Sequence, residues 1–354
     1  MLRLWGGWWS RGEPLSLVRS EIAEQPEVLE RLLAEEGGAI AAAAREIARR
    51  RPRYAVIAAR GSSDNAARYA QHLLGRLARM PVALATPSLH TLYHEPPRYT
   101  DALVLGISQS GESPDIVAVL EEARRQGATT LALTNDPGSP LALAAGHSLA
   151  LHAGEERSVA ATKTYTASLG LLAALVSAIC GDRARRTELQ GMPEAMARQL
   201  ALASEADDLV SVAAGWERLA VIGRGADYST AFEAALKLKE LTRIAAEPYS
   251  SADFLHGPIA VVDHGFPVLG IAPPGPTAAG VREVLDQVRE RGGETVVVGK
   301  AREDELRLRL IAVPDWLSPL VAVMPAQLLA VGVAERLGLD VDQPAGLHKI
   351  TRTT

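Results

Sequence analysis

The sequence predicts an α/β fold with two tandem domains, each a parallel sheet flanked by helices. Three observations lead to this prediction: short apolar runs alternate with longer amphipathic runs, the alternation occurs twice, and landmarks of the first half recur in the second. Apolar strands separated by helices favour parallel sheets that are covered on both faces. The length of 354 residues also suits two domains of roughly 150 residues each.

Eight strands are predicted from apolar or β-branched runs, and helical spacing marks the segments between them. The strands are expected at 54–59, 102–108, 130–134, 148–151, 219–223, 267–272, 295–299 and 308–313. Amphipathic helices are expected at 65–77, 114–126, 228–241 and 278–291. The most apolar stretch, 169–180, is shorter than the roughly 20 residues that span a bilayer, so we expect a buried helix there.

An internal repeat supports the two-domain interpretation. The tetrapeptide Val-Leu-Gly-Ile at 104–107 recurs at 268–271, an offset of 164 residues. Further landmarks recur in the same order: Arg60-Gly61 and Arg224-Gly225 at the same offset, Gly127 and Gly292 at 165, and an Ala-Val-Ile run before each Arg-Gly. We therefore expect two copies of one βαβ domain. The expected boundaries are a leader at 1–20, the first domain at 21–195, the second at 196–340 and a C-terminal tail at 341–354.

Composition excludes several classes of protein. The 37 basic and 42 acidic residues give a formal charge of −5 without a basic patch, which argues against nucleic-acid binding. A single cysteine, Cys180, excludes a disulfide framework and a cysteine-based zinc site, and it favours a cytoplasmic location. The tryptophan-rich N-terminus lacks the order of a signal peptide, so we expect either a disordered leader or a docking arm.

The clearest chemical signal is the run Ser-Gln-Ser-Gly-Glu-Ser at 108–113, between a predicted strand and a helix that opens with proline. The side chains of Ser108, Gln109, Ser110 and Ser113, together with backbone N–H groups at a helix N-terminus, suit a phosphate monoester. A Walker A loop is excluded because no Gly-Lys-Ser/Thr follows. The alternative is an ordinary serine-rich helix cap.

A second hydroxyl-rich segment, Arg-Gly-Ser-Ser-Asp-Asn at 60–65, follows the first predicted strand. Ligands of open α/β sheets bind outside the carboxyl ends of strands, so Ser62 and Ser63 are expected to share one crevice with the 108–113 loop. The corresponding place in the second half, 272–277, reads Ala-Pro-Pro-Gly-Pro-Thr and lacks most of these donors. We therefore expect one phosphate loop per chain.

The second half supplies candidate acid–base residues. Lys237 and Glu240 lie three positions apart on a predicted helix and share one face of it. His256 stands in a loop marked by Gly-Pro, and Lys349 lies near the C-terminus. Each has an ordinary alternative: a solvated helix pair, a loop histidine and a solvated end residue.

Taken together, these residues resemble the sugar isomerase (SIS) domain family, as two tandem SIS domains with flavodoxin-like sandwiches. The resemblance runs from residue 21 to Lys349 and rests on five motifs in order: SQSGES at 108–113, VAATK at 159–163, ALKLKE at 235–240, FLHGP at 254–258 and DVDQP at 340–344. The chain is similar to the isomerase half of glutamine–fructose-6-phosphate aminotransferase and to the stand-alone SIS-type glucosamine-6-phosphate deaminases.

The resemblance implies a role for each matched residue. The sugar phosphate is held by Ser108, Gln109, Ser110 and Ser113, with Ser62 and Ser63 against the same ligand and Val159 lending backbone contacts. Glu240 is the proton shuttle with Lys237 beside it, His256 assists ring opening from the neighbouring subunit, and Lys349 closes over the sugar. A homodimer with a shared site is therefore expected. No metal, organic cofactor, nucleic acid or membrane is expected as a partner.

Two departures from the synthase shift the expected activity. Leu2 follows Met1 where the synthase has its nucleophilic cysteine, and from the length of 354 residues we expect no glutaminase. Ala161 stands where the synthase has serine, and the 60–65 loop looks more like that of the deaminases. We therefore expect conversion of glucosamine 6-phosphate to fructose 6-phosphate and ammonia. The alternatives are another SIS isomerase or deglycase acting on galactosamine 6-phosphate or fructosamine 6-phosphate, a synthase-type isomerase without its glutaminase, and a non-catalytic phosphosugar sensor.

Overall fold

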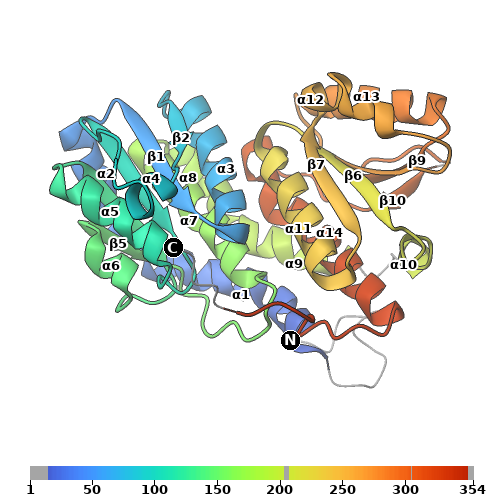
Figure 1. Ribbon diagram of the computed structural model, residues 1–354, viewed down its shortest axis with the longest axis horizontal. Coiled ribbons are helices and arrows are strands. Elements are labelled where there is room, and N and C mark those ends of the chain that lie inside the picture. The colour runs from blue at the N-terminus through green and yellow to red at the C-terminus, as the bar shows by residue number, and fades with distance from the viewer. Residues whose placement is uncertain (1–14, 203–206, 304, 350–354) are drawn as a thin grey trace. The chain divides into compact units, whose positions relative to one another are not determined.

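The computed structural model describes residues 15–202, 207–303 and 305–349, which form two compact units (Figure 1). The N-terminal unit comprises Glu27–Glu156, Lys163–Gly191 and the described end of the chain from His348. The C-terminal unit comprises the described chain up to Pro26, the short segment Arg157–Thr162 and Met192–Leu347. The predicted leader begins with residues 1–14, which lie outside the described residues, whereas helix α1 (Leu17–Glu35) already starts within its last residues.

The N-terminal unit is built on a parallel sheet with the strand order β2-β1-β3-β4-β5. Its strands are β1 (Tyr54–Ala59), β2 (Val82–Leu84), β3 (Ala102–Ile107), β4 (Thr129–Thr134) and β5 (His147–Ala150). Its helices are α2 (Gly37–Arg50), α3 (Gly61–Leu77), α4 (Ser88–Thr91), α5 (Pro114–Arg125), α6 (Pro140–Ala144), α7 (Lys163–Ile179) and α8 (Arg183–Gln190). Helices α2 and α3 pack on α7, whereas α4 and α6 pack on α5. Every residue of the central strand β3 is buried, as expected for a sheet covered on both faces.

The C-terminal unit contains a second parallel sheet with the order β10-β9-β8-β6-β7. Its strands are β6 (Arg218–Gly223), β7 (Ala245–Ser250), β8 (Pro267–Ala272), β9 (Glu294–Gly299) and β10 (Leu306–Leu308). Its helices are α9 (Met192–Leu202), α10 (Asp207–Ala213), α11 (Tyr228–Thr242), α12 (Ser251–Leu255), α13 (Ala278–Glu290) and α14 (Ser318–Arg336), with short 3-10 turns η3 (Gly225–Asp227), η4 (Pro258–Val261) and η5 (Asp315–Leu317). Taken in chain order, the two sheets have the same topology.

The strand register confirms the predicted duplication. Val56 pairs with Val104 in the first sheet, and Ala220 pairs with Val268 in the second, which is the same pair shifted by 164 positions. Gly106 and Gly270 occupy equivalent places in β3 and β8, where an added Cβ would lie 2.8 Å from a methyl group of Leu120 and 2.7 Å from one of Leu285, respectively. The recurring glycine therefore lets a helix pack closely on the central strand of each copy.

In each sheet, the strands that follow the first strand of the repeat are added on both of its sides, so the strand order reverses next to that first strand. In the N-terminal unit this reversal falls between β1 and β3, whose last residues Ala59 and Ile107 are paired. Ligands of doubly wound sheets bind at this switch point, outside the carboxyl ends of the two strands. The segments that follow β1 and β3 are the 60–65 and 108–113 loops, so the fold brings both hydroxyl-rich loops to one edge, as predicted.

The strand predictions were incomplete at the edges of the sheets. The structure adds β2 and β7, which were not predicted, and it places the last strand at Leu306–Leu308 rather than at 308–313. Both missed strands are edge strands: β2 has three residues, and β7 contains Pro248 within the sequence Ala-Ala-Glu-Pro-Tyr-Ser. Edge strands tolerate proline and polar residues because only one of their sides pairs, so they lack the apolar pattern of a central strand.

Two apolar helices form the cores of the units. The predicted buried helix at 169–180 is the second part of α7, in which residues from Lys163 to Ser177 are buried. One helical span in the described part of the chain, Asp315–Arg336, is long and apolar enough to cross a membrane, but the whole of its apolar window is buried inside the structure. It packs against α11, so it has the setting of a core helix.

Candidate functional site

The 108–113 loop has a fixed backbone. The N–H of Gly111 donates to Ser108 Oγ over 3.1 Å, and the N–H of Glu112 donates to Ser110 Oγ over 3.3 Å. The carbonyl of Gln109 accepts from Asn135 N–H over 3.0 Å and from Thr134 Oγ1 over 3.2 Å. The loop is thus held from within and from the end of the neighbouring strand β4.

Gly111 is required by this loop for two reasons. Its φ of +65° lies in the left-handed region, which side chains with a Cβ rarely adopt. A Cβ at this position would also lie 2.1 Å from Ser139 Oγ, and Ser139 is a buried residue that caps α6. The loop therefore lies directly against the start of α6.

Two helices begin at this edge of the sheet. Helix α3 starts at Gly61, directly after β1, so Ser62 and Ser63 lie in its first turn. Helix α5 starts at Pro114, and its N-cap residue Ser113 makes no side-chain capping bond. The N-terminus of a helix attracts anions because its first N–H groups lack intrahelical partners. The serines predicted to hold phosphate therefore lie at two such ends.

An ion pair that the sequence analysis missed joins the two loops. Arg60, the N-cap residue of α3, pairs with Asp115 in the first turn of α5, with Nη2 at 2.8 Å and Nε at 3.0 Å from Asp115 Oδ2. The carboxylate is almost completely buried, whereas the side chain of Arg60 is 52% exposed. The partners lie 55 positions apart, so the sequence has no local spacing that would reveal the pair, although Arg60 recurs as Arg224 in the repeat.

Lys237 and Glu240 are brought together as predicted, within a larger cluster on α11. Lys237 Nζ donates to Glu240 Oε2 over 2.5 Å and lies 3.4 Å from Glu233 Oε1. Lys237 and Glu233 are fully buried, whereas the side chain of Glu240 is 23% exposed. The buried ammonium therefore fixes one carboxylate oxygen of a residue that solvent can reach. Glu233, four positions before Lys237, was not singled out from the sequence.

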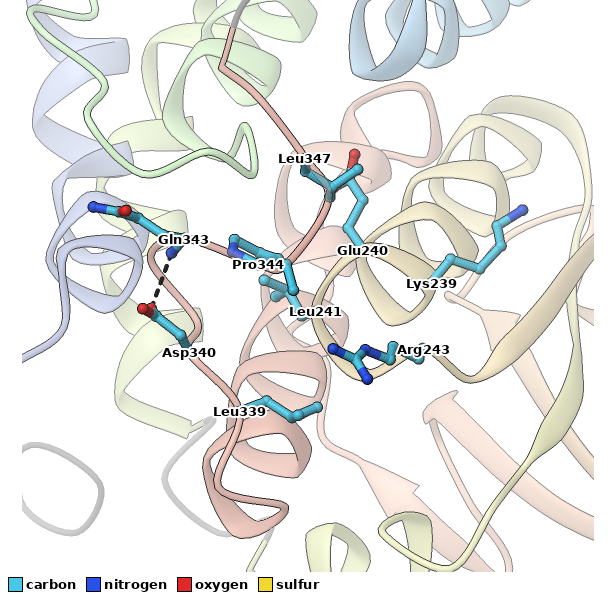
Figure 2. A pocket seen from close by; sticks show the side chains of 10 residues that line it. Lys239, Glu240, Leu241, Arg243, Leu339, Asp340, Gln343, Pro344 and Leu347 are labelled. Carbon is cyan, nitrogen blue, oxygen red and sulfur yellow. Dashed lines mark hydrogen bonds between the residues drawn. The ribbon is translucent and has the colours of Figure 1, made fainter.

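Glu240 lines a pocket of about 280 Å³ between the end of α11 and the C-terminal tail. Figure 2 shows Glu240 beside Leu347 of the tail, with Arg243 on another side of the pocket. The remaining lining residues are Lys239, Leu241, Leu339, Asp340, Gln343, Pro344 and Ala345. The DVDQP motif thus forms one wall of this pocket, where Asp340 Oδ1 accepts from the N–H of Gln343 over 2.9 Å.

Val159 lies in the short segment that belongs to the C-terminal unit. Its N–H donates to the carbonyl of Asp342 over 3.1 Å, so this N–H is already occupied within the chain. The side chain of Asp342 accepts from the N–H groups of Leu17 and Val18, each over 2.9 Å, and thereby caps α1. Glu21 of α1 in turn accepts from Arg157 N–H. These contacts connect the start of α1, the Val159 segment and the tail.

His256 does not belong to the pocket of Glu240. It follows α12, its side chain is exposed, and it is absent from the residues that line the pocket. Lys349 lies in the N-terminal unit, where its Nζ is 2.9 Å from Oε2 of the buried Glu156. The same carboxylate accepts from Thr164 Oγ1 over 2.6 Å. Glu156 therefore fixes the described end of the chain.

The switch point of the second copy is lined by different residues. Asp227 stands where the first copy has Ser63, and its carboxylate accepts from Ser318 Oγ and Thr230 Oγ1. Burial raises the pKa of Asp227 to about 7. At Gly275, the equivalent of Gly111, an added Cβ would lie 3.2 Å from Asp315. This copy therefore has acids and packed side chains in place of the hydroxyl donors of the first copy.

Among residues 15–202, 207–303 and 305–349, no group of three or more His, Cys, Asp or Glu side chains is arranged to hold a metal ion.

Comparison with known proteins shows the family. The model of the SIS domain matches residues 50–178 and 214–334, which is one match in each copy. The glutamine–fructose-6-phosphate aminotransferase (isomerizing) of Thermus thermophilus is 38% identical over 350 residues, covering 93% of this chain and 57% of the relative. The chain therefore spans somewhat more than half the length of this curated relative.

Solved structures agree with this assignment. A protein from Silicibacter pomeroyi, provisionally assigned as a phosphosugar isomerase, superposes with a TM-score of 0.84 at 35% identity, covering 93% of this chain and 99% of that one. The C-terminal domain of glucosamine-fructose-6-phosphate aminotransferase from Francisella tularensis superposes with a TM-score of 0.85 at 28% identity, covering 95% of this chain and all of that one. With two family matches and a repeated topology, the chain belongs to the SIS domain family and contains two SIS domains in tandem.

Proposed function

We propose that this protein is an amino-sugar phosphate isomerase that converts glucosamine 6-phosphate and water to fructose 6-phosphate and ammonia. The observation that carries the proposal is the carboxylate of Glu240, which lines a pocket and is hydrogen-bonded to the buried ammonium of Lys237. A carboxylate held in one orientation but open to solvent suits a general base that moves a proton between adjacent carbons. The similarity to isomerising aminotransferases supports the same class of reaction.

In this proposal, binding of the phosphate group orients the sugar. The 108–113 loop and the first turn of α3 offer the hydroxyls of Ser62, Ser63, Ser108, Ser110 and Ser113, the amide of Gln109 and backbone N–H groups. Anchoring a phosphate that does not react lets binding energy position the reacting carbons. The proposal requires that this loop and Glu240 act on the same sugar, whichever chains supply them.

The chemical steps follow from the substrate. His256 assists opening of the pyranose ring, which gives the 2-amino aldehyde. Glu240 then removes the proton from carbon 2 and delivers a proton to carbon 1. The amino nitrogen loses a proton and the oxygen on carbon 1 gains one, which leaves an imine at carbon 2 and a hydroxyl at carbon 1. Water adds to this imine and ammonia leaves, giving fructose 6-phosphate. Lys237 and Lys349 stabilise the negative charge that develops on oxygen during proton transfer.

The proposed enzyme is a cytoplasmic homodimer in which His256 comes from the neighbouring subunit. The exposed position of His256, outside the pocket of Glu240, supports this part of the proposal. Lys349 is proposed to close over the sugar, with Glu156 as the carboxylate that anchors it.

A second candidate is the isomerase reaction of a synthase, which forms glucosamine 6-phosphate from fructose 6-phosphate and ammonia. The 38% identity to an isomerising aminotransferase favours it. The two reactions are opposite directions of one chemistry, so both need Glu240 as the base.

The proposal is tested by measuring ammonia and fructose 6-phosphate released from glucosamine 6-phosphate, galactosamine 6-phosphate and fructosamine 6-phosphate. We expect turnover of glucosamine 6-phosphate, and a loss of at least about 100-fold in kcat for Glu240→Gln, the usual contribution of a general base. Glu283→Gln makes the same change at an exposed residue of α13 in the same unit, outside the pocket lining, and is the matched control. Absence of turnover in both directions, or full activity of Glu240→Gln, would contradict the proposal.

A further inference from the structure

We propose that Arg60 is the cation that binds the substrate phosphate at the switch point of the N-terminal unit, and that Asp115 is the positioning residue that directs it there. This inference rests on the proposed function for the identity of the substrate. It adds a charged group to a site that otherwise consists of hydroxyls, an amide and backbone N–H groups.

The ion pair has one buried and one exposed end. The Asp115 side chain is 1% exposed, and its Oδ1 accepts from Ile116 N–H over 2.9 Å. Arg60 contributes Nε and Nη2 to Oδ2 of the same carboxylate, and its side chain is 52% exposed. The positive end of the pair therefore faces solvent beside the first turns of α3 and α5. A guanidinium held by two of its nitrogen atoms retains further donors for a phosphate oxygen.

Charge balance indicates why such a cation is needed. A phosphate monoester carries a charge of about −1.5 to −2 at neutral pH. The 60–65 and 108–115 segments contain three acidic residues, Asp64, Glu112 and Asp115, and Arg60 is their only Lys or Arg. Asp64 is paired with Arg68 of α3 over 3.1 Å, so Arg60 is the cation that the two segments themselves offer to a dianion. With Arg60, the phosphate gains a charge-assisted hydrogen bond, which is stronger than a neutral one.

The second copy provides an internal comparison. Arg224 occupies the place of Arg60, but Ala279 stands where the first copy has Asp115. Lacking that carboxylate, Arg224 donates instead to Ser251 Oγ of α12 over 3.2 Å. The same copy has Asp227 in place of Ser63 and prolines in place of the serine loop. Arg224 also lies beside the start of the helix after its central strand, where an added Cβ at Gly280 would be 3.8 Å from its Cδ. The copies therefore differ in the carboxylate that holds the arginine there, which is present in the copy that keeps the hydroxyl donors.

Calorimetric titration of the full chain with fructose 6-phosphate, inorganic phosphate and unphosphorylated fructose tests this role without requiring turnover. For Arg60→Gln we expect affinity for fructose 6-phosphate to fall at least about 10-fold, the value of a charged hydrogen bond, with a shallower salt dependence. Arg60→Lys keeps the charge but not the planar fork, so we expect an intermediate loss. Asp115→Asn should lower affinity for both phosphates, because the arginine loses its anchor.

The matched control is Arg224→Gln, which removes the equivalent arginine from the copy without a serine loop and should bind all three ligands as the wild type does. Melting temperatures of the variants show whether each remains folded. The inference is overturned if Arg60→Gln and Arg60→Lys both bind fructose 6-phosphate as tightly as the wild type, or if the wild type binds neither phosphate. A wild type that binds fructose 6-phosphate but releases no ammonia would sink the proposed reaction and leave this inference intact.

Discussion

At the scale of single residues, the two copies differ at a position where the first would meet its ligand. Ser63 of the first copy is partly exposed, whereas its equivalent Asp227 is 2% exposed and hydrogen-bonded to Thr230 and Ser318. A hydroxyl at the start of a helix can serve a phosphate, but a buried carboxylate repels one. The difference at this position fits the proposal that the first copy binds the phosphate.

Asp227 should make the stability of the protein depend on pH. Its pKa is raised to about 7 in the folded protein by burial, against an ordinary value of 3.8. The folded state therefore binds this proton more tightly than the unfolded state. The protonated Asp227 therefore contributes fully to the free energy of unfolding below about pH 4. This contribution, about 4 kcal/mol in total, is lost as the pH rises to about 7. Asp227→Asn should remove this dependence.

The measurement is the free energy of unfolding by urea between pH 4 and pH 8, for the wild type and for Asp227→Asn. We expect the free energy of unfolding of the wild type, minus that of the variant, to fall as the pH rises across this range. At pH 8 the variant should be the more stable protein. Asp263→Asn, which changes an exposed aspartate of the same unit, is the control and should follow the wild type. Parallel curves for the wild type and Asp227→Asn would show that Asp227 is already ionised at low pH.

At the scale of elements, the sequence predicts central strands and helices well because their patterns are local. The central strands β3 and β8 are continuous apolar runs, and α5 begins where proline follows the serine loop, as predicted. The edge strands β2 and β7 escape prediction because one paired side and partial burial do not demand an apolar pattern. The ion pair of Arg60 with Asp115 also escapes, since the topology of the sheet creates that contact.

The serine loop should be sensitive to the smallest side chain at Gly111. Gly111→Ala places a Cβ at a φ of +65° and within 2.1 Å of Ser139 Oγ, so the loop or the cap of α6 must move. We expect loss of stability of about 1 to 2 kcal/mol from the backbone conformation and a further loss of about 1 to 3 kcal/mol from the collision. Affinity for fructose 6-phosphate should fall more than 10-fold, because Ser108 and Ser110 share the displaced backbone.

Gly127→Ala is the matched control. Gly127 has a φ of +81° at the other end of α5, but no atom lies within 4 Å of an added Cβ. Gly127→Ala should therefore lose only the stability that the backbone conformation costs, without the loss from a collision. It should keep its affinity for fructose 6-phosphate. Melting temperature and calorimetric titration measure both effects. Equal affinities for the two alanine variants would show that the loop does not hold the phosphate.

At the scale of the whole molecule, the residues expected in one site are divided between two units. The loop serines and Lys349 lie in the N-terminal unit, whereas Lys237, Glu240, His256 and Val159 lie in the C-terminal unit. The sequence could not predict that residues 157–162 group with the second sheet. That grouping depends on Glu21 and Asp342, which bind Arg157 and Val159 from distant parts of the chain.

The exposed position of His256 leads to a prediction about assembly. If His256 acts in the site of a partner subunit, Glu240→Gln and His256→Asn damage different halves of a shared site. Each variant alone should be nearly inactive. A hybrid dimer of the two would contain one site with both defects and one with neither, so co-expression should restore about a quarter of wild-type activity when half of the dimers are hybrids.

Two different affinity tags allow the hybrid to be purified in series, and its ammonia release is compared with that of each variant homodimer. A hybrid with about half the activity of the wild type per dimer is expected, because one of its two sites is intact. The control is a hybrid dimer of one Glu240→Gln chain and one Lys237→Met chain. Both changes damage the same half of the site, so this hybrid should have no restored activity. If the first hybrid is as inactive as this control, His256 works within its own chain, and the exposed loop after α12 has another role.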